Sequence, residues 1–593
     1  MTFPRMSRIL AQALLCLLLD ALAAAPAAAT KLPGDWIEAR SAHFVVLGNV
    51  TEKKAREIVA EFERIRAFFA SRIPGVVVAD DPPLWIYVAR DDATMQVLMP
   101  SLIQERGAGS VGGRFVTRPT AQFIQLRAGN GEDWDLQVVF HEYFHYLSDR
   151  LDLDLPLWLE EGLADFWGAT QFTRDAVEIG RLLPNRMKAV GGLELERLLV
   201  LDRTSPEYRD PARRGIVYAG SWALVHYLVL GEKGARSSQL PRYIDLVRTG
   251  RDSLTAAKEA FGELAELDRG LSRYRAATIY PLGKIPPAAA APPLEVALRK
   301  VGDGEAAARI VVAQFATEPT DEMARWVKLA REQAPAAAAT DLATGLLALR
   351  ERRLPEAESG FARAANGPAQ DEQMAIAWYG LAVLEMNRDS SPSGLTRAEN
   401  RLQRAVDLDP RFAAAHSRLA EIYLRQGDPR RALSPLRVAR RLRPDDDFLD
   451  LVEIHCLERL GSHAAAETWL TRIVADALRS ESAPYLNNLC WHGTLLGYAS
   501  YFLRVCDKEI ESSPASGTIL DSRGVARGLT GDTVGAAADF RAALAAQESS
   551  FTDAERELRR SWLDVLGQGG NPFTPALLQD LLHGPLSGLR WGR

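Results

Sequence analysis

Residues 138–147 of this chain read VVFHEYFHYL. Apolar residues recur in this stretch at steps of three and four, which predicts a helix with one buried face. His141 and His145 are one turn apart on that helix and project from the same side. Two imidazoles on one face can hold a single Zn²⁺ ion, and the carboxylate of Glu142 can reach a water bound to it. The alternative is a helix that carries two half-buried, hydrogen-bonded histidines.

A catalytic zinc site needs a third protein ligand and leaves its fourth position for water. After a short loop, residues 155–167 read LPLWLEEGLADFW, which predicts a second helix with Pro156 near its first turn. The short connection allows the two helices to pack side by side. A carboxylate of the second helix then faces the histidines of the first.

These two segments resemble the peptidase MA-like proteins, a branch of the gluzincin metallopeptidases. The resemblance rests on H-E-x-x-H at residues 141–145 and on P-x-W-x-x-E-G-x-A-x-aromatic at residues 156–166. It implies a thermolysin-like fold, a bound Zn²⁺ ion and peptide-bond hydrolysis. It also implies that the glutamate before the glycine, Glu161, is the third zinc ligand.

Glu160 is the alternative ligand, but adjacent helical residues point about 100° apart, so only one of the two glutamates can face the metal. Glu161 shares a face with Asp165, which can accept the free N–H of a ligating imidazole and fix its tautomer. Gly162 is expected to let the two helices approach closely, and Trp158 to close the wall of the site. Glu160 is then expected to point toward solvent or the substrate cleft.

The region before the zinc-binding helix mixes strands with helices, so residues 30–283 are expected to form an α+β domain. In gluzincins an edge strand above the metal holds the peptide substrate extended by backbone hydrogen bonds. Gly113 to Val116 is the candidate, and an ordinary hairpin is the alternative. The expected elements are strands at 43–47 and 84–88, a helix at 52–73 and a hairpin of 112–116 with 121–126.

A later helix begins near Tyr218. Gluzincins commonly use a tyrosine or histidine from this region to stabilise the oxyanion, and Tyr218 lies in a family-like Y-x-x-S-W pattern, with His226 on about the same face. The chemistry needs a donor aimed at the charge that develops on the carbonyl oxygen. Tyr218 is therefore the second candidate catalytic residue after Glu142. The alternative is a tyrosine and a histidine packed in the core.

The second half of the chain is a repeat region. IPPAAAAPP at 285–293 has the composition of a linker, and Ala-rich helical patterns follow it. Four of these patterns start at Ala338, Ala375, Ala413 and Gly517, and they resemble tetratricopeptide repeats. Pro410 and Pro444 are 444 − 410 = 34 residues apart, the length of that repeat.

The expected organisation is a linker with lead-in helices at 284–336, an all-α tetratricopeptide solenoid at 337–550, and a C-terminal helical cap or tail at 551–593. Residues 447–516 fit the repeat less well. We expect the two halves to fold independently on either side of the linker. Solenoids of this kind usually bind other proteins along a concave face, although a structural extension without a partner is the alternative.

The first 29 residues predict a secretory signal peptide, because an apolar run precedes Ala27-Ala28-Ala29. The mature chain is then exported, to the periplasm or outside the cell, with no membrane span. It keeps Cys456, Cys490 and Cys506, an odd number that argues against a disulfide framework. Three buried thiols are the favoured expectation, although Cys490 and Cys506 could pair in an oxidising compartment.

The best-supported function is an exported zinc metallopeptidase with Glu142 as general base, acting on a peptide or protein, with a protein partner on the repeats. One alternative is an inactive metal-binding domain joined to a repeat scaffold, acting as an interaction module of the envelope. Another is a zinc hydrolase acting on some other amide, such as a cell-wall peptide. The chain carries 71 basic and 77 acidic residues and shows no basic patch, so nucleic acid is not an expected partner.

Overall fold

The computed structural model describes residues 31–583, with gaps at 72–81, 107–111, 119–120, 129–135, 152–154, 174, 183–192, 203–204, 250, 278, 287–293, 316, 369–370, 444–445, 480–482, 513–515 and 547–550. The predicted signal peptide, residues 1–29, lies outside the described residues, as do most of the Pro/Ala run and residues 584–593. Of the helices that the structure describes, none combines the length and the apolar character needed to span a bilayer.

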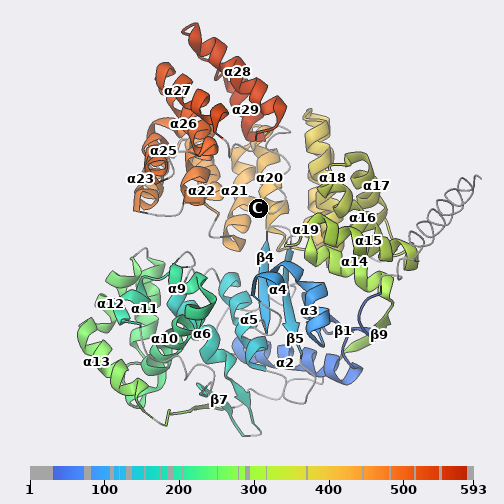
Figure 1. The fold of residues 1–593 in the computed structure, drawn as a ribbon, viewed down its shortest axis with the longest axis vertical. Coiled ribbons are helices and arrows are strands. Elements are labelled where there is room, and N and C mark those ends of the chain that lie inside the picture. The colour runs from blue at the N-terminus through green and yellow to red at the C-terminus, as the bar shows by residue number, and fades with distance from the viewer. Residues whose placement is uncertain are drawn as a thin grey trace, which may run out of the picture.

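A six-stranded sheet forms the centre of the first half (Figure 1). Its spatial order is β4-β5-β3-β2-β1-β9, with β2, β3 and β5 parallel and the other neighbours antiparallel. The strands are β1 (Trp36–Arg40), β2 (Phe44–Gly48), β3 (Leu84–Ala89), β4 (Gly113–Arg118), β5 (Ala121–Arg127) and β9 (Ala297–Val301). The strands expected near 43–47, 84–88, 112–116 and 121–126 are therefore present, and β1 and β9 were not expected.

Both faces of this sheet are buried, which explains the nearly continuous apolar sequence of its central strands. Val46, Ile86 and Ile124 face the helices α2 (Glu52–Ala70) and α5 (Leu136–Arg150), in one core. The alternate residues of the same strands belong to a second core with helices α3 (Asp92–Leu98) and α14 (Asp303–Gln314). The short helix α4 (Pro100–Arg106) follows α3.

A group of helices follows α5 and packs beside the sheet (Figure 1). The most extensive contact in this group joins α6 (Leu157–Gly168) to α10 (Pro211–Leu230). The other elements are β6 (Gln171–Phe172), β7 (Val177–Ile179), α8 (Leu195–Leu199), α9 (Pro206–Arg209), η2 (Gly231–Gly234), α11 (Gln239–Arg248), α12 (Ser253–Phe261), α13 (Leu264–Arg275) and β8 (Gly283–Ile285).

Paired helices make up the rest of the chain. Helices begin at Ala338, Ala375, Ala413 and Gly517, which confirms the four repeat starts. The pairs are α14 with α15 (Thr320–Gln333), α16 (Ala338–Arg350) with α17 (Leu354–Ala365), α18 (Ala375–Arg388) with α19 (Pro392–Leu408), α20 (Ala413–Arg425) with α21 (Pro429–Leu442), α22 (Asp447–Arg459) with α23 (His463–Arg479), and α26 (Gly517–Leu529) with α27 (Thr533–Ala545). The helices α28 (Asp553–Gly567) and α29 (Pro575–His583) follow.

Small residues allow these helices to pack closely. The ring of Phe361 lies between Gly345 and Gly380, where an added Cβ would meet its atoms at 2.7 Å on either side. Phe540 fills the same role against Gly524, at 2.9 Å. Each aromatic side chain is fully buried, so the Gly and Ala positions of the repeat decide how near neighbouring helices come.

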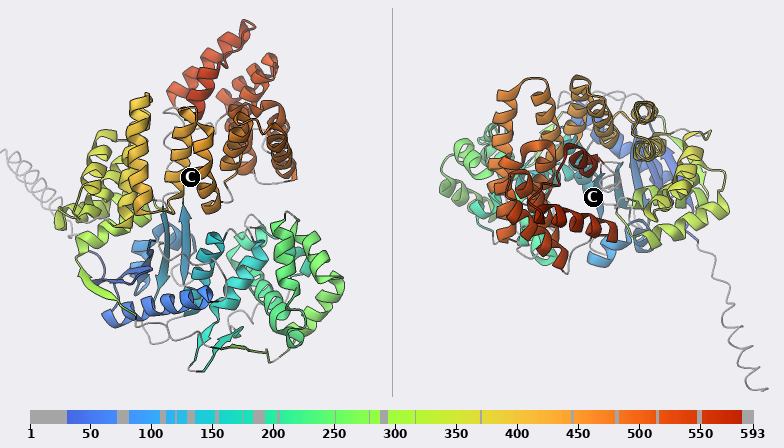
Figure 2. Two further views of the ribbon diagram at one scale, coloured as in Figure 1. Left: turned by 180° about the vertical axis from the view of Figure 1, so that it is seen from behind. Right: turned by 90° about the horizontal axis from the view of Figure 1, so that it is seen from above.

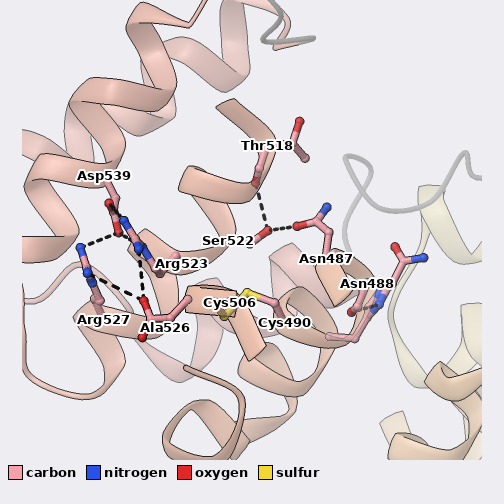
Figure 3. Close-up of a disulfide and its surroundings, with 12 residues drawn as sticks. Asn487, Asn488, Cys490, Cys506, Thr518, Ser522, Arg523, Ala526, Arg527 and Asp539 are labelled. Carbon is pink, nitrogen blue, oxygen red and sulfur yellow. Dashed lines mark hydrogen bonds and ion pairs between the residues drawn. A yellow bond between two sulfur atoms is a disulfide. The ribbon is translucent and has the colours of Figure 1, made fainter. Parts of the chain in front are cut away.

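The poorly fitting segment 447–516 contains an irregular helix pair. Helix α24 (Ala483–Gly493) runs through a π-helical turn, η4 (Thr494–Tyr498), into α25 (Ala499–Ser512), and Gly497 takes a positive φ of 98°. A disulfide joins Cys490 of α24 to Cys506 of α25, whose Cα atoms are 5.2 Å apart (Figure 3). The expectation of three buried thiols was therefore wrong for this pair, and only Cys456 is a free, buried thiol among the described cysteines.

The two halves share a core, which differs from the independent folding expected from the Pro/Ala run. Strand β9 lies beyond that run and pairs with β1, with Trp36 opposite Val301. Helix α14 then covers one sheet face, where the hydroxyl of Tyr87 donates to the Arg309 carbonyl at 3.1 Å. The solenoid rises from this face and arches over the first half (Figure 2).

Candidate metal centre

A glycine at the contact between helices α5 and α6 allows them to lie side by side. A Cβ added to Gly168 would lie 3.0 Å from the Gln137 carbonyl oxygen and 3.4 Å from the His141 Cβ. Gly162, which was expected to have this role, faces α10 instead, where an added Cβ would meet the Ser221 carbonyl oxygen at 2.6 Å. Gly162 thus fixes α6 against α10, and Gly168 brings α6 to the histidines of α5.

Three ligand atoms converge between these helices. The Nε2 atoms of His141 and His145 are 3.1 Å apart, and Oε2 of Glu161 lies 3.5 Å from each. Zn–N and Zn–O bonds near 2.0–2.1 Å in tetrahedral geometry place ligand atoms about 3.3 Å apart. Among the residues that the structure describes, these three form the one cluster of His, Cys, Asp or Glu side chains that could hold a metal ion.

Each converging group is held by a partner on its far side. Nδ1 of His141 lies 3.0 Å from Oδ1 of Asp165, and Nδ1 of His145 lies 3.1 Å from Oε1 of Glu160. Because a carboxylate accepts, both imidazoles donate from Nδ1, and the lone pair of each Nε2 faces the other and Oε2 of Glu161. That oxygen is buried and makes no hydrogen bond to any described residue. When both imidazoles are neutral, these three atoms are acceptors that face one another, an arrangement that a cation balances, so the residues fit a zinc ion.

Asp165 therefore lies where the sequence predicted. The orientation expected for Glu160 was wrong, since it orients His145 as Asp165 orients His141. The hydroxyl of Tyr208 donates to Oε1 of Glu161 at 2.9 Å, a contact that was not predicted. Tyr208 lies on the four-residue helix α9, within a charged segment, and no periodicity or motif marks it.

The electrostatics of the site favour positive charge. Burial lowers the pKa of His141, but the hydrogen bond to Asp165 and the Glu161 carboxylate outweigh burial and raise that pKa to about 9. Burial raises the pKa of Glu161, but the two imidazoles hold it well below its usual range. Protons on the imidazoles thus balance the carboxylates. A bound dication would displace those protons, which couples metal affinity to pH.

Glu142 is held against the edge strand. Its Oε2 accepts the backbone N–H of Phe115 at 2.5 Å. Strand β4 pairs with β5 on one side, and no other described strand pairs with it. Gly113 lets this strand approach α5, because an added Cβ would lie 2.8 Å from Val138. The expected edge strand at Gly113 to Val116 is therefore present, and its role in holding a substrate stays a prediction.

Tyr218 of α10 lies at the site. Its ring centroid is 6.1 Å from that of His141 and 6.2 Å from that of Tyr208. Burial, followed by the nearby Glu161 charge, raises the pKa of Tyr218 well above its usual value, so its hydroxyl keeps its proton. That is the state a hydrogen-bond donor requires.

Two other side chains considered for this region belong to the core. His226 is fully buried, with Nδ1 2.6 Å from the Tyr274 hydroxyl and Nε2 2.7 Å from the Gly180 carbonyl oxygen, and burial lowers its pKa to about 4. Trp158 was expected to wall the site. Instead it is fully buried and donates from Nε1 to the Tyr243 hydroxyl at 3.0 Å.

Comparison with known proteins identifies the repeats. The tetratricopeptide repeat family matches residues 395–453, which include all of α20 and α21, so this chain carries tetratricopeptide repeats. A solved tetratricopeptide repeat protein from Parabacteroides merdae is 14% identical, over 45% of this chain and 100% of that chain, with a TM-score of 0.33. A human IFIT1 dimer with PPP-AAAA is 15% identical, over 48% of this chain and 69% of that one, with a TM-score of 0.26.

No curated protein matches the sequence. The repeats indicate protein–protein interaction, and the peptidase resemblance of residues 30–283 stays a prediction.

Proposed function

We propose that this chain is an exported zinc-dependent metallopeptidase whose tetratricopeptide repeats bind protein. The observation that carries the proposal is the convergence of His141, His145 and Glu161, with a buried, unsatisfied carboxylate oxygen between two imidazole nitrogens. These three residues would hold the ion. With neutral imidazoles, three acceptors that face one another are costly unless a cation, either protons or a metal ion, balances them.

Zinc bound there would supply a Lewis acid that polarises the scissile carbonyl and lowers the pKa of the attacking water to about 7. Glu142 accepts the proton of that water and passes it to the leaving amine nitrogen as the C–N bond breaks. The Phe115 N–H fixes the position of the Glu142 carboxylate. Tyr218 is the candidate donor to the carbonyl oxygen, where negative charge develops.

The outer edge of β4 is the candidate binding surface for the peptide. The N–H and C=O of one residue in an antiparallel strand point to the same side, so the Phe115 carbonyl shares the edge that its N–H presents to Glu142. An extended peptide paired along this edge would lie beside Glu142. The backbone would thus align the scissile bond without reading side chains.

The disulfide supports export. Disulfides form and persist in oxidising compartments and are rare in the cytosol. The Cys490–Cys506 bond joins two helices of the repeat region, where Cys490 and Cys506 are both buried. Together with the predicted signal peptide, it favours the periplasm or the extracellular space.

The test combines zinc analysis of the purified protein with turnover of a mixed peptide library, with and without chelator. One zinc ion per chain and chelator-sensitive cleavage are expected. Glu142→Gln should keep zinc while turnover falls by at least ~10²-fold, the usual scale for a general base. Unchanged turnover in this variant would remove Glu142 from the mechanism and the gluzincin assignment with it.

A second candidate is a metal-binding but inactive domain joined to a repeat scaffold, acting as an interaction module of the envelope. The matched repeats at 395–453 favour a binding role of this kind. Zinc retained with no turnover on any library peptide, together with protein ligands captured by the repeats, would favour this candidate over a peptidase.

A further inference from the structure

A cavity lies where the β4–β5 hairpin meets the repeats. Thr117 and Arg118 line it from the hairpin and Tyr146 from α5. Arg411, from the turn between α19 and α20, and Arg443, from the end of α21, line the opposite side. Figure 1 and the left view of Figure 2 show β4 directed at α20 and α21. Each half of the chain therefore supplies part of the wall.

Arg411 is the unusual member of this wall. Its Nη1 donates to the Tyr146 hydroxyl at 2.9 Å, and its guanidinium lies over the Tyr146 ring, 5.4 Å from the centroid. Its Nη2 is buried and has no hydrogen-bond partner among the described residues. A guanidinium nitrogen that is withdrawn from water and unpaired is costly, and it becomes favourable when an oxygen anion occupies the cavity.

The acidic residues of the wall already have partners. Both oxygens of the Glu372 carboxylate are used, since Arg40 donates to Oε1 at 3.1 Å and to Oε2 at 3.4 Å, and the Trp85 indole N–H donates to Oε1 at 2.5 Å. Asp409 accepts the backbone N–H of Arg411 at 2.9 Å.

Of the two other cations, Arg443 is paired with Asp446 at 2.8 Å, and Arg118 donates to the Thr117 carbonyl oxygen at 2.9 Å. Of these three described arginines, Arg411 is thus the one with a buried donor nitrogen that has no partner.

Two contacts link the wall of this cavity to the candidate catalytic site. Tyr146 follows the ligand His145 on α5, and its ring packs edge-on against Phe115, 5.9 Å between centroids. Phe115 is the residue whose N–H holds Glu142. From Phe115 to Arg118 the strand advances three residues, about 10 Å. A peptide paired along β4 would therefore place a residue about three positions from the scissile bond at the cavity.

We propose that this cavity is a substrate subsite, built jointly by the hairpin and the repeats, that binds a carboxylate of the peptide through Arg411. The inference rests on the proposed peptidase function and names its substrate class. Two sources supply the same group: an acidic side chain within a longer peptide, or the free carboxyl end of the chain. The subsite makes the repeats part of the substrate-binding surface.

The test uses the full chain with zinc and two matched pools of fluorescent peptides that differ only by Glu or Gln at a fixed position. A third pool holds the Gln peptides in two forms, one with a free C-terminus and one with an amidated C-terminus. Binding is measured by fluorescence anisotropy on the Glu142→Gln variant, and cleavage on the wild type. The carboxylate is expected to tighten binding roughly ten- to hundredfold, the range of a charge-assisted hydrogen bond. Tighter binding of the Glu pool than of the Gln pool identifies an acidic side chain as the bound group. Tighter binding of the free form than of the amidated form in the third pool identifies the chain end.

Arg411→Gln should remove the preference while zinc content and thermal stability are kept, and Arg411→Lys should restore part of it. Arg404→Gln is the matched control, because Arg404 is an exposed arginine of α19 outside the cavity. A preference that survives in Arg411→Gln, or equal binding of all pools, overturns the subsite and leaves the peptidase assignment standing. If no pool is cleaved, the peptidase assignment fails, and the anisotropy difference decides the subsite separately.

Discussion

The helices of the candidate metal centre and the solenoid each bury a glutamate, and the charge states of the two glutamates differ. Glu161 of α6 and Glu509 of α25 are both 1% exposed, and in each the Oε2 atom has no hydrogen-bond partner among the described residues. Burial raises the pKa of both carboxyls, but two imidazoles bring the pKa of Glu161 well below its usual range, whereas the pKa of Glu509 rises to about 8. An unsatisfied buried carboxylate is therefore prepared for a metal only where other ligands converge on it.

Removing the glutamate of the candidate metal centre gives the largest expected effect. Glu161→Ala should lose most of the zinc and all of the peptidase activity, because two imidazoles alone leave the site without its anionic ligand. Glu160→Ala should keep one zinc ion per chain at saturating zinc, since Glu160 contacts Nδ1 of His145 and is not one of the three converging ligands. Metal analysis of both variants checks this. Zinc lost from Glu160→Ala and kept by Glu161→Ala would show that the ligand has been assigned to the wrong neighbour.

Substituting the carboxylates that contact Nδ1 of the two histidines gives the next largest expected effect. Asp165→Asn keeps the shape but removes the charge that orients His141, so zinc affinity should fall about 10- to 100-fold. Glu160→Gln should do the same through His145. Competition against a chelator of known affinity measures both. The contrast with Glu509 is direct, because Glu509→Gln should leave zinc affinity unchanged.

The packing of α6 against α10 gives the next effect, a change in the stability of the chain. Gly162→Ala places a methyl group 2.6 Å from the Ser221 carbonyl oxygen, so the free energy of unfolding should fall by about 1–3 kcal/mol. Gly215→Ala is the control, because nothing lies within 4 Å of its added Cβ and it lies inside helix α10. That variant should gain roughly 0.5–1 kcal/mol. Denaturant unfolding compares them, and equal stability of the two variants would contradict the role given to Gly162.

The smallest effect concerns pH and the solenoid glutamate. The pKa of Glu509 is raised in the folded chain, so the unfolded chain ionises first as pH rises from about 4.5 to about 8, and stability is lost across that window. Glu509→Gln cannot ionise. The difference in Tm between variant and wild type should therefore grow with pH from 4.5 to 8. A difference that stays constant across this range would mean that Glu509 has a partner in solution.

Much of the candidate site and of the repeat region could be predicted from the sequence, because both depend on residues that are only a few positions apart. His141 and His145 are one turn apart on α5, and Glu161 and Asp165 are one turn apart on α6. The two pairs face each other, as predicted. The repeat starts could be placed because small residues recur at fixed intervals.

Other features depend on contacts between distant segments. Tyr208 reaches Glu161 from a four-residue helix, and no periodic pattern marks that helix. Tyr218 and His226 share a face of α10, yet one lies at the site and the other in the core, which only the packing of neighbouring helices decides. Gly162 and Gly168 both lie on α6, and sequence alone did not show which one faces α5.

The pairing of β1 with β9 has a consequence for how the chain reaches its native state. Trp36 and Val301 are 301 − 36 = 265 residues apart, and the hydrogen bonds from Arg40 to Glu372 span still more. A chain that emerges from a membrane channel N-terminus first leaves the outer edge of β1 unpaired until β9 has followed it. Contacts this remote in sequence make folding slow and leave strand edges open to other chains meanwhile. If the chain is exported as proposed, it is most exposed to aggregation before residue 301 has crossed the membrane, and a chaperone at the channel exit would act in that interval.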